Sequence, residues 1–183
     1  MENLECSKRT CSGNRPIHFW IVTSGLHFSR HLSNAILDAM CDKFLPYSVL
    51  SKATLRGKEY AWPFPAVEEA VTAAVASRLA TFGGQAQFRI PEGTCELYWL
   101  SADSDKRLPD EGWDDYVARS AAEVLAKFVA MWKQTDFTKE ARQWPDLNRL
   151  HTQGVDLNQC LCFVLYFGTE PTAPAELSKA DFK

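Results

Sequence analysis

Apolar residues at helical spacing make residues 110–133 the longest regular element that the sequence predicts. Apolar side chains recur there every three or four positions, which places them along one stripe of an α-helix. The stripe consists of Trp113, Val117, Ala121, Val124, Phe128 and Met131, with Leu125 beside it. Acidic residues at the start and Lys133 near the end suit the helix dipole, and we expect Asp110 to cap the first turn. A helix of this length spans roughly 35 Å, so other elements should pack along it.

The same period predicts two further helices, at residues 29–44 and 66–81. In the first of these, large apolar residues repeat every four positions, and we expect Pro46 to end the helix because proline lacks an amide hydrogen. In the second, the apolar stripe is rich in alanine, and the pair Gly83-Gly84 should end it. Small residues on a buried stripe would allow a neighbouring element to approach closely.

Two segments, residues 17–23 and 157–167, are apolar at successive positions rather than at alternate ones. Apolar residues on both faces are typical of strands near the middle of a sheet. Residues 47–56 favour a strand only weakly, and residues 136–151 predict one or two short helical turns. The sequence therefore predicts at least two central strands and one weaker one.

A β-hairpin is predicted where residues 85–90 and 95–100 flank a short connection that contains proline and glycine. In the first strand Gln87 and Arg89 alternate with apolar residues, so we expect that face of the hairpin to be wet. Interspersed helices and strands of this kind predict an α+β fold, with three main helices packed on a mixed or mainly antiparallel sheet of about four to six strands.

The elements suggest a single α+β domain at residues 16–168, with a flexible leader at 1–15 and a flexible tail at 169–183. A net charge of −3 argues against the positive surface field with which a protein attracts nucleic acids or anionic membranes. The apolar runs are too short to cross a bilayer, and the first residues do not resemble a signal peptide. We therefore expect a cytoplasmic protein without membrane or nucleic-acid partners.

Six cysteines in such a compartment are expected to stay reduced, and we expect no cofactor and no metal. Cys41 and Cys95 fall in helical and strand patterns and should be small core residues. The alternative is a zinc site built from two cysteine pairs whose spacing is not standard. Those pairs are Cys6 with Cys11 and Cys160 with Cys162.

Acidic and aromatic residues supply the candidate partner-binding surface. The acidic candidates precede and begin the long helix, and they are Asp103, Asp105, Asp110, Asp114 and Asp115. The aromatic candidates are Tyr60, Trp62 and Phe64, in a proline-rich stretch, residues 57–65, that we expect to be a loop. Such a loop either packs on the core as a flap, which we favour, or offers a contact surface. The sequence thus suggests a small protein-binding protein of inhibitor, immunity-protein or adaptor type, whose partner carries a basic surface.

Two alternatives remain open. The turn Thr23-Ser24-Gly25 precedes a predicted helix, where amide groups can hold an anion, and Arg30 would add positive charge. His27 and His31 are one helical turn apart and could share a metal ion, so a small enzyme or an anion- or metal-binding protein is possible. No phosphate-binding, dinucleotide-binding or nucleophile motif supports that alternative. The second alternative is a subunit of a larger assembly, in which a neighbour covers the aromatic stretch.

Overall fold

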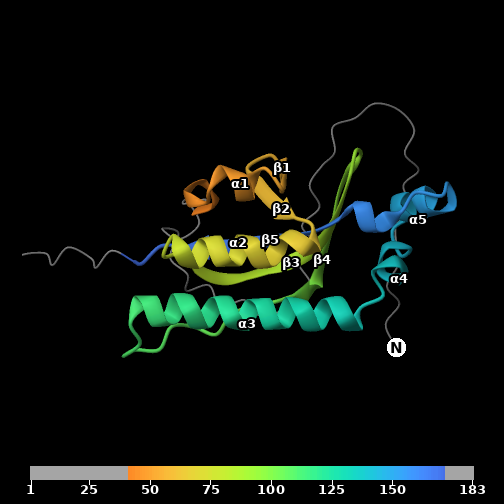
Figure 1. The fold of residues 1–183 in the computed structure, drawn as a ribbon. Helices are drawn as coiled ribbons and strands as arrows, with labels where there is room; N and C mark the ends of the chain where they lie inside the picture. Colours follow the sequence, from red (N-terminus) through yellow and green to blue (C-terminus); the bar gives the residue numbers. More distant parts are fainter. Residues whose placement is uncertain (1–40, 172–183) are drawn as a thin grey trace, which may run out of the picture. The chain divides into compact units, whose positions relative to one another are not determined.

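A computed structural model describes residues 41–171, and its centre is one antiparallel sheet with strand order β1-β2-β5-β3-β4 (Figure 1). The strands are β1 (Thr54–Arg56), β2 (Glu59–Trp62), β3 (Ala80–Ile90), β4 (Gly93–Ser101) and β5 (Leu161–Gly168). The last strand in the sequence therefore lies between β2 and β3, and it pairs with both.

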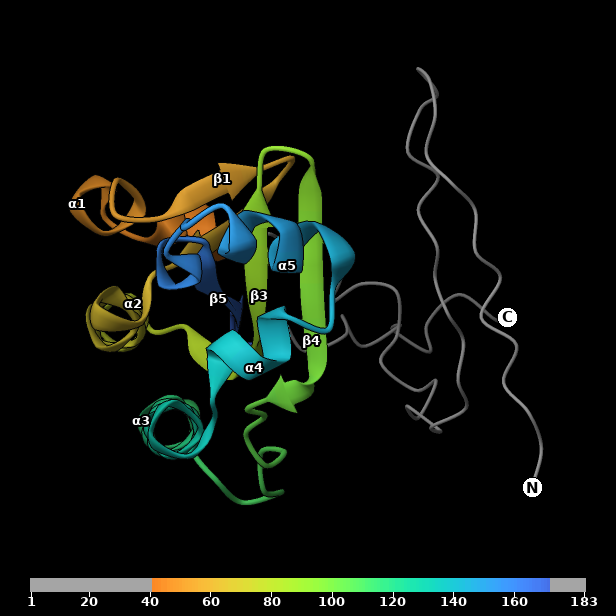
Figure 2. The ribbon, with the colours of Figure 1, turned by 90° about the vertical axis from the view of Figure 1, so that its right-hand side faces the viewer.

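Within this described range five α-helices accompany the sheet, so the predicted α+β fold is confirmed. They are α1 (Tyr47–Leu50), α2 (Phe64–Ala76), α3 (Trp113–Gln134), α4 (Phe137–Ala141) and α5 (Pro145–Thr152), with 3-10 turns η1 (Cys41–Phe44) and η2 (Leu157–Gln159). The predicted strand 17–23, most of the predicted helix 29–44 and the leader 1–15 lie outside the described residues. Figure 2 shows α2 and α3 side by side on the same face of the sheet.

The predicted stripe of α3 is confirmed, because its apolar residues are buried except for Met131, which is half-buried. Phe128 meets Phe163 of β5 edge to face, with 5.3 Å between the ring centroids. Phe137 of α4 meets the same ring at 6.0 Å, also edge to face. Aromatic rings prefer this arrangement because the positive edge of one approaches the negative face of the other. Phe163 is thus the centre of the core between the sheet and α3.

The predicted start of α3 was wrong. The helix begins at Trp113, and Gly112 is the residue before it, without a side-chain cap. Asp110 lies in the preceding loop, whereas Asp114 and Asp115 occupy the first turn as expected. Trp113 fixes the start instead, because its ring is buried and its indole N–H donates to the carbonyl of Arg78 at 2.9 Å.

The predicted end of α2 was also wrong, because the helix stops well before the glycine pair. The N–H of Leu79 donates to the carbonyl of Ala74 at 2.8 Å, and the N–H of Arg78 donates to that of Val75 at 2.9 Å. These two bonds are the Schellman pattern, and Arg78 takes the left-handed conformation that the pattern requires, with φ of 56°. An arginine fills a position where glycine is usual, so no glycine marked this end in the sequence.

Gly83 and Gly84 lie inside β3 instead of at a helix end. A β-carbon on Gly84 would lie 2.0 Å from the carbonyl oxygen of Val164 and 3.0 Å from the ring of Phe128. The glycine therefore lets β3 pass close to β5 under the main helix. The pair marks a close approach of the backbone, which the sequence pattern alone did not distinguish from a helix stop.

The stretch predicted as an aromatic loop, residues 57–65, is mostly regular structure. Gly57, at φ of 63°, turns the chain between β1 and β2, and Trp62 on β2 is fully buried. The indole N–H of Trp62 donates to the carbonyl of Val49 at 3.1 Å, which ties β2 to α1. The weak strand predicted at 47–56 was right only for its last residues, since α1 occupies its beginning. The last strand, predicted at residues 157–167, begins later than expected, at Leu161, because η2 and Cys160 occupy the first part of that range.

Candidate functional site

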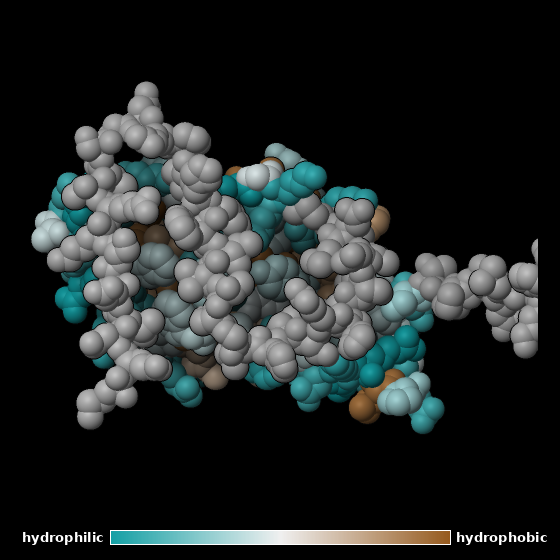
Figure 3. All heavy atoms as spheres, turned by 180° about the vertical axis from the view of Figure 1, so that it is seen from behind, coloured by the Kyte–Doolittle hydropathy of each residue, from teal (hydrophilic) through white to brown (hydrophobic). Residues whose placement is uncertain are grey.

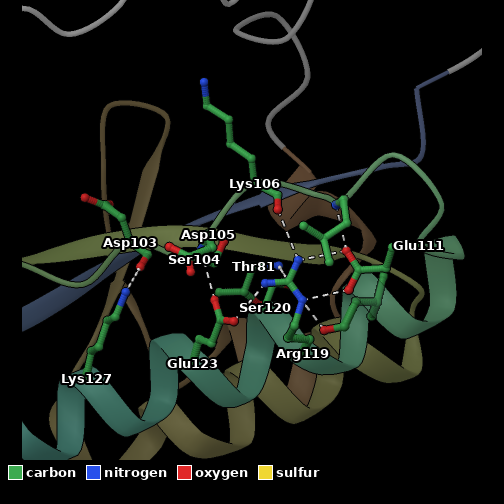
Figure 4. Close-up of polar contacts among 12 residues, drawn as sticks. Thr81, Asp103, Ser104, Asp105, Lys106, Glu111, Arg119, Ser120, Glu123 and Lys127 are labelled. Atoms are coloured by element: carbon green, nitrogen blue, oxygen red, sulfur yellow. Dashed lines mark hydrogen bonds and ion pairs between the residues drawn. The ribbon is translucent and has the colours of Figure 1, made fainter.

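The loop between β4 and α3, residues 102–112, is held on α3 by one arginine, and we call it the clamped loop (Figure 4). Arg119 binds both carboxylate oxygens of Glu111, with Nε and Nη2 each 2.7 Å from an oxygen. Its Nη1 lies 2.7 Å from the carboxylate of Glu123, one helical turn further along α3. Its Nη2 also donates to the backbone carbonyl of Lys106 at 3.1 Å. One side chain thus joins the middle and the end of the loop to the helix.

Further hydrogen bonds fix the loop, among them one from the N–H of Ser104 to the carbonyl of Phe82 on β3 at 3.0 Å. The carboxylate of Glu123 accepts the backbone N–H of Asp105 at 2.9 Å, and that of Glu111 accepts the N–H of Leu108 at 3.0 Å. The ammonium of Lys127 donates to the backbone carbonyl of Asp103. The hydrogen bond from Arg119 is the main cause that lowers the pKa of Glu111 to about 2. The backbone bond from Asp105, followed by Arg119, lowers the pKa of Glu123.

The clamped loop presents only part of the predicted acidic surface. Asp103, Asp105 and Asp110 are exposed on it, and Asp115 is exposed at the start of α3. Asp114 forms an ion pair with Arg78 at 2.8 Å, so its charge is partly neutralised. Lys106 and Arg107 of the same loop are exposed as well, so the loop is mixed in charge. The sequence located the acidic residues but gave no sign that Arg119, at position i+8 from Glu111, would organise them.

The predicted aromatic surface is not one surface. Trp62 is buried in the core, which corrects its assignment as a contact residue, and Tyr60 and Phe64 are half-buried. The ring of Phe64 stacks on that of Trp132 of α3 at 4.2 Å. A tryptophan with no exposed surface is out of reach for a partner in this conformation.

The exposed aromatic residues of the described range lie elsewhere. They are Phe44 on η1, Tyr47 on α1, Tyr98 and Trp99 on β4, Trp132 on α3 and Tyr166 on β5. Tyr98 and Trp99 are neighbours on the edge strand β4, and each is more than half exposed, while Tyr166 on β5 is 43% exposed. The indole of Trp99 donates to Glu140 of α4 at 3.2 Å. An irregularity in the pairing of β3 with β4 lets β4 turn two adjacent aromatic side chains outward, which strict alternation would not predict.

The face of the sheet away from α2 and α3 carries a second cluster, which we call the polar sheet face. It consists of Glu59, Gln85, Gln87, Arg89, Glu96 and Tyr166, around the small buried residues Ala61, Cys162 and Val164. Alternation places these residues opposite Phe88, Ile90 and Leu165, which belong to the core under the helices. Where described residues are visible in Figure 3, seen from behind, most of the surface is hydrophilic.

The prediction of a wet face for Gln87 and Arg89 was wrong, because Gln87 is fully buried and the Arg89 side chain is only 6% exposed. The guanidinium of Arg89 reaches across β5 to Glu59 of β2 at 2.8 Å and to the carbonyl of Thr54 of β1 at 2.6 Å. The amide nitrogen of Gln87 donates to the same Glu59 carboxylate at 3.3 Å. Partners far away in the sequence made these polar side chains compatible with burial.

The residues of the alternative anion or metal pocket lie outside the described part of the chain. They are Ser24, His27, Arg30 and His31, together with the turn that precedes them. Among residues 41–171 no group of three or more histidine, cysteine, aspartate or glutamate side chains is placed to hold a metal ion. Cys41 and Cys95 are buried in the core, as predicted, and no disulfide joins Cys41, Cys95, Cys160 or Cys162 within the described residues. The other pair of the zinc alternative, Cys6 and Cys11, falls outside the described residues.

Two hollows in the described residues have volumes of about 190 Å³ and 120 Å³. Both are below the roughly 300 Å³ at which pockets for small molecules begin. None of the helices in the described range is both long enough and apolar enough to cross a bilayer. Comparisons of the chain with family models, with curated proteins and with solved structures give no match.

Proposed function

We propose that this is a protein-binding protein of inhibitor, immunity-protein or adaptor type, and that its clamped loop meets a basic surface on the partner. One observation supports the proposal above the others. A segment without regular secondary structure is fixed by Arg119, while the carboxylates of Asp103 and Asp105 are exposed and form no hydrogen bond or ion pair with a described residue. The carboxylates that hold the loop are Glu111 and Glu123, so the two aspartates stay available for a partner.

A fixed loop is better suited to binding than a free one. Ordering the backbone of one residue costs about 1–2 kcal/mol, and a loop that orders only on binding loses that free energy from its affinity. The clamp orders the loop before the partner arrives. Opposite charges then steer the encounter, and salt screens them beyond about 8–10 Å. This combination favours fast association with a basic surface over tight binding of a small molecule.

The test begins with capture of partners from native lysate on the full-length protein, followed by association rates measured with the purified partner. The double variant Asp103→Lys/Asp105→Lys should associate more slowly, and the difference from wild type should shrink as salt is added. The single variant Asp105→Lys is compared with Glu68→Lys, which makes the same change of charge on the exposed side of α2. Equal rates for these two single variants at low salt would show that the clamped loop is not the contact.

A further inference from the structure

The two edges of the sheet differ in how well they are protected against pairing with a further strand. Natural proteins protect such edges by keeping them short, by placing lysine or proline on them, or by covering them. At one edge, β1 has only three residues, and its Thr54 carbonyl already accepts from Arg89. At the other edge, β4 has nine residues with neither lysine nor proline, and no described strand lies beyond it (Figure 2). The edge of β4 is therefore the one open to an added strand.

Two residues of β4 direct their backbone groups away from the sheet. Arg89 of β3 lies opposite Thr94, and its N–H donates to the carbonyl of Cys160, directly before β5, at 2.8 Å. Arg89 and Thr94 are therefore a non-hydrogen-bonded pair, in which both residues turn their N–H and C=O groups away from each other. Glu96, two residues further along β4, has the same orientation as Thr94, whereas the residue between them faces β3. The N–H and C=O groups of Thr94 and Glu96 thus lie along the open edge.

A bulge with two aromatic side chains ends this open stretch. Pairing of β4 with β3 is regular up to Leu97 and resumes only at Ser101, so Tyr98 and Trp99 have no partner on β3. Both are more than half exposed, and their rings meet edge to face with 6.4 Å between the centroids. The indole N–H of Trp99 donates to Glu140 of α4 at 3.2 Å, which fixes its orientation. Two oriented rings therefore stand at the end of the edge, where side chains of an added strand can pack on them.

The charge along this edge is negative. Glu96 is the one charged residue of β4, and it has no ion-pair partner among the described residues. The amide of Gln85 donates to its carboxylate at 3.4 Å, a long hydrogen bond. Beyond the bulge β4 leads into the clamped loop, where Asp103 and Asp105 are exposed. Opposite charges on facing strand residues contribute about 0.2–1 kcal/mol, so a strand with a cation across from Glu96 fits this edge.

We propose that the basic partner adds an extended segment to the open edge of β4, with a lysine or arginine across from Glu96. This inference rests on the proposed function and states how the basic segment is bound. Backbone hydrogen bonds to Thr94 and Glu96 supply affinity, and alternate side chains of the segment supply specificity, as in other complexes formed by strand addition. Because β4 leads directly into the clamped loop, one basic segment reaches both surfaces.

The experiment is an NMR titration of the full-length, isotope-labelled protein with a blocked peptide of alternating lysine and valine residues. We expect the backbone amide signals of Thr94 and Glu96 to shift, while those of Cys95 and Leu97, which face β3, change less. With the peptide at about ten times its dissociation constant, hydrogen exchange of the Thr94 and Glu96 amides should slow about tenfold, because only the unbound fraction exchanges.

Two N-methylated peptides test the backbone pairing without any change to the protein. Facing residues of a hydrogen-bonded pair direct their amides at each other, so the lysine across from Glu96 turns its N–H toward β4, and the valine N–H groups turn away. Methylation of the lysine amides should therefore abolish binding, whereas methylation of the valine amides should change the dissociation constant by less than about twofold.

A pair of charge reversals tests the contact with Glu96. Glu96→Lys should weaken binding of the unmethylated peptide about fivefold, since an attraction between facing residues becomes a repulsion. Glu68→Lys makes the same change of charge on the exposed side of α2 and should leave the binding unchanged.

Three results would overturn the inference. They are equal binding of the two methylated peptides, equal binding by Glu96→Lys and Glu68→Lys, and slow exchange at the edge of the free protein. If the Thr94 and Glu96 amides of the free, dilute protein exchange as slowly as that of Cys95, another part of the chain or a second copy already covers the edge. If Glu96→Lys does not fold, the methylated peptides still decide the outcome.

Rates with the purified partner separate this inference from the proposed function. Slower association of Asp103→Lys/Asp105→Lys, together with equal dissociation rates for Glu96→Lys and Glu68→Lys, would retain the clamped loop and reject the edge. Faster dissociation of Glu96→Lys than of Glu68→Lys, together with unchanged association of the double variant, would retain the edge and reject the loop as the contact.

Discussion

Replacing Phe128 by alanine removes a fully buried ring from the middle of the α3 stripe. The ring contacts Phe163 edge to face and lies over the backbone at Gly84, so helix, β3 and β5 all border the space that it leaves. The glycine has no side chain with which to fill this space, and the neighbouring strands are fixed by their hydrogen bonds. The site therefore has little room to collapse.

Truncation of a buried phenylalanine lowers the free energy of unfolding by about 3–5 kcal/mol. This loss combines the transfer free energy of the removed atoms with the cost of the cavity that they leave. The aromatic pair with Phe163 accounts for about 0.5–1.5 kcal/mol of it. We expect a loss in the upper half of this range of about 3–5 kcal/mol because the strands that border the cavity are fixed by their hydrogen bonds. The control is Phe44→Ala, since Phe44 is 51% exposed and its truncation should cost under about 1 kcal/mol.

Equilibrium unfolding in urea, followed by the fluorescence of the tryptophans, measures both variants. With a slope of about 1–3 kcal/mol per molar urea, a loss of this size lowers the midpoint by more than about 1 M. The slope itself should not change, because the unfolded chain exposes nearly the same surface. A loss for Phe128→Ala as small as that for Phe44→Ala would show that α3 does not pack on the sheet as described.

Three further predictions concern β3, the clamp and pH. Gly84→Ala should lower stability by more than about 2 kcal/mol in the same assay, since the added β-carbon would meet the carbonyl oxygen of Val164. In the control Gly93→Ala the added β-carbon enters open space, so the loss should be under about 1 kcal/mol. Arg119→Met should leave the folded core in place but speed hydrogen exchange of the amides of the clamped loop, which mass spectrometry detects; unchanged exchange would contradict the clamp. Burial, followed by Glu59, raises the pKa of Asp42 from 3.8 to about 6. The folded state therefore binds more protons than the unfolded state between these values, and this contribution to stability is lost as pH rises from about 4 to about 6. At pH 7 Asp42→Asn should raise the free energy of unfolding by about 1–2 kcal/mol, after allowance for partial exposure. The variant should also lose the fall in stability as pH rises, and a variant that keeps this fall would assign it to another group.

The sequence predicted elements whose signals are local. The α3 stripe and the β3–β4 hairpin follow from side-chain period and turn residues, and both are present. The end of α2 was missed because Arg78 occupies the left-handed position that glycine usually marks, and because sheet pairing, not glycine, decides where β3 begins.

Of the candidate site, the sequence supplied the exposed aspartates and missed their supports. Arg119 is an ordinary surface position on a helical pattern until Glu111 and Lys106 fold back to it. Gln87 and Arg89 alternate with apolar residues as exposed side chains do, and only the approach of Glu59, from another hairpin, explains their burial. Contacts between distant segments depend on the topology, which no local pattern encodes.

The place of β5 in the sheet has a consequence for how the chain acquires its structure. The β1–β2 and β3–β4 hairpins are complete once the chain has reached Ser101, yet the strand that joins them begins only at Leu161. Until it inserts, each hairpin keeps an open edge that can pair with another chain. Joining them requires contacts over long sequence separations, which slows folding. A nascent or truncated chain that stops before Leu161 should therefore aggregate by strand pairing, and insertion of β5 is the event that covers the open edges of β2 and β3.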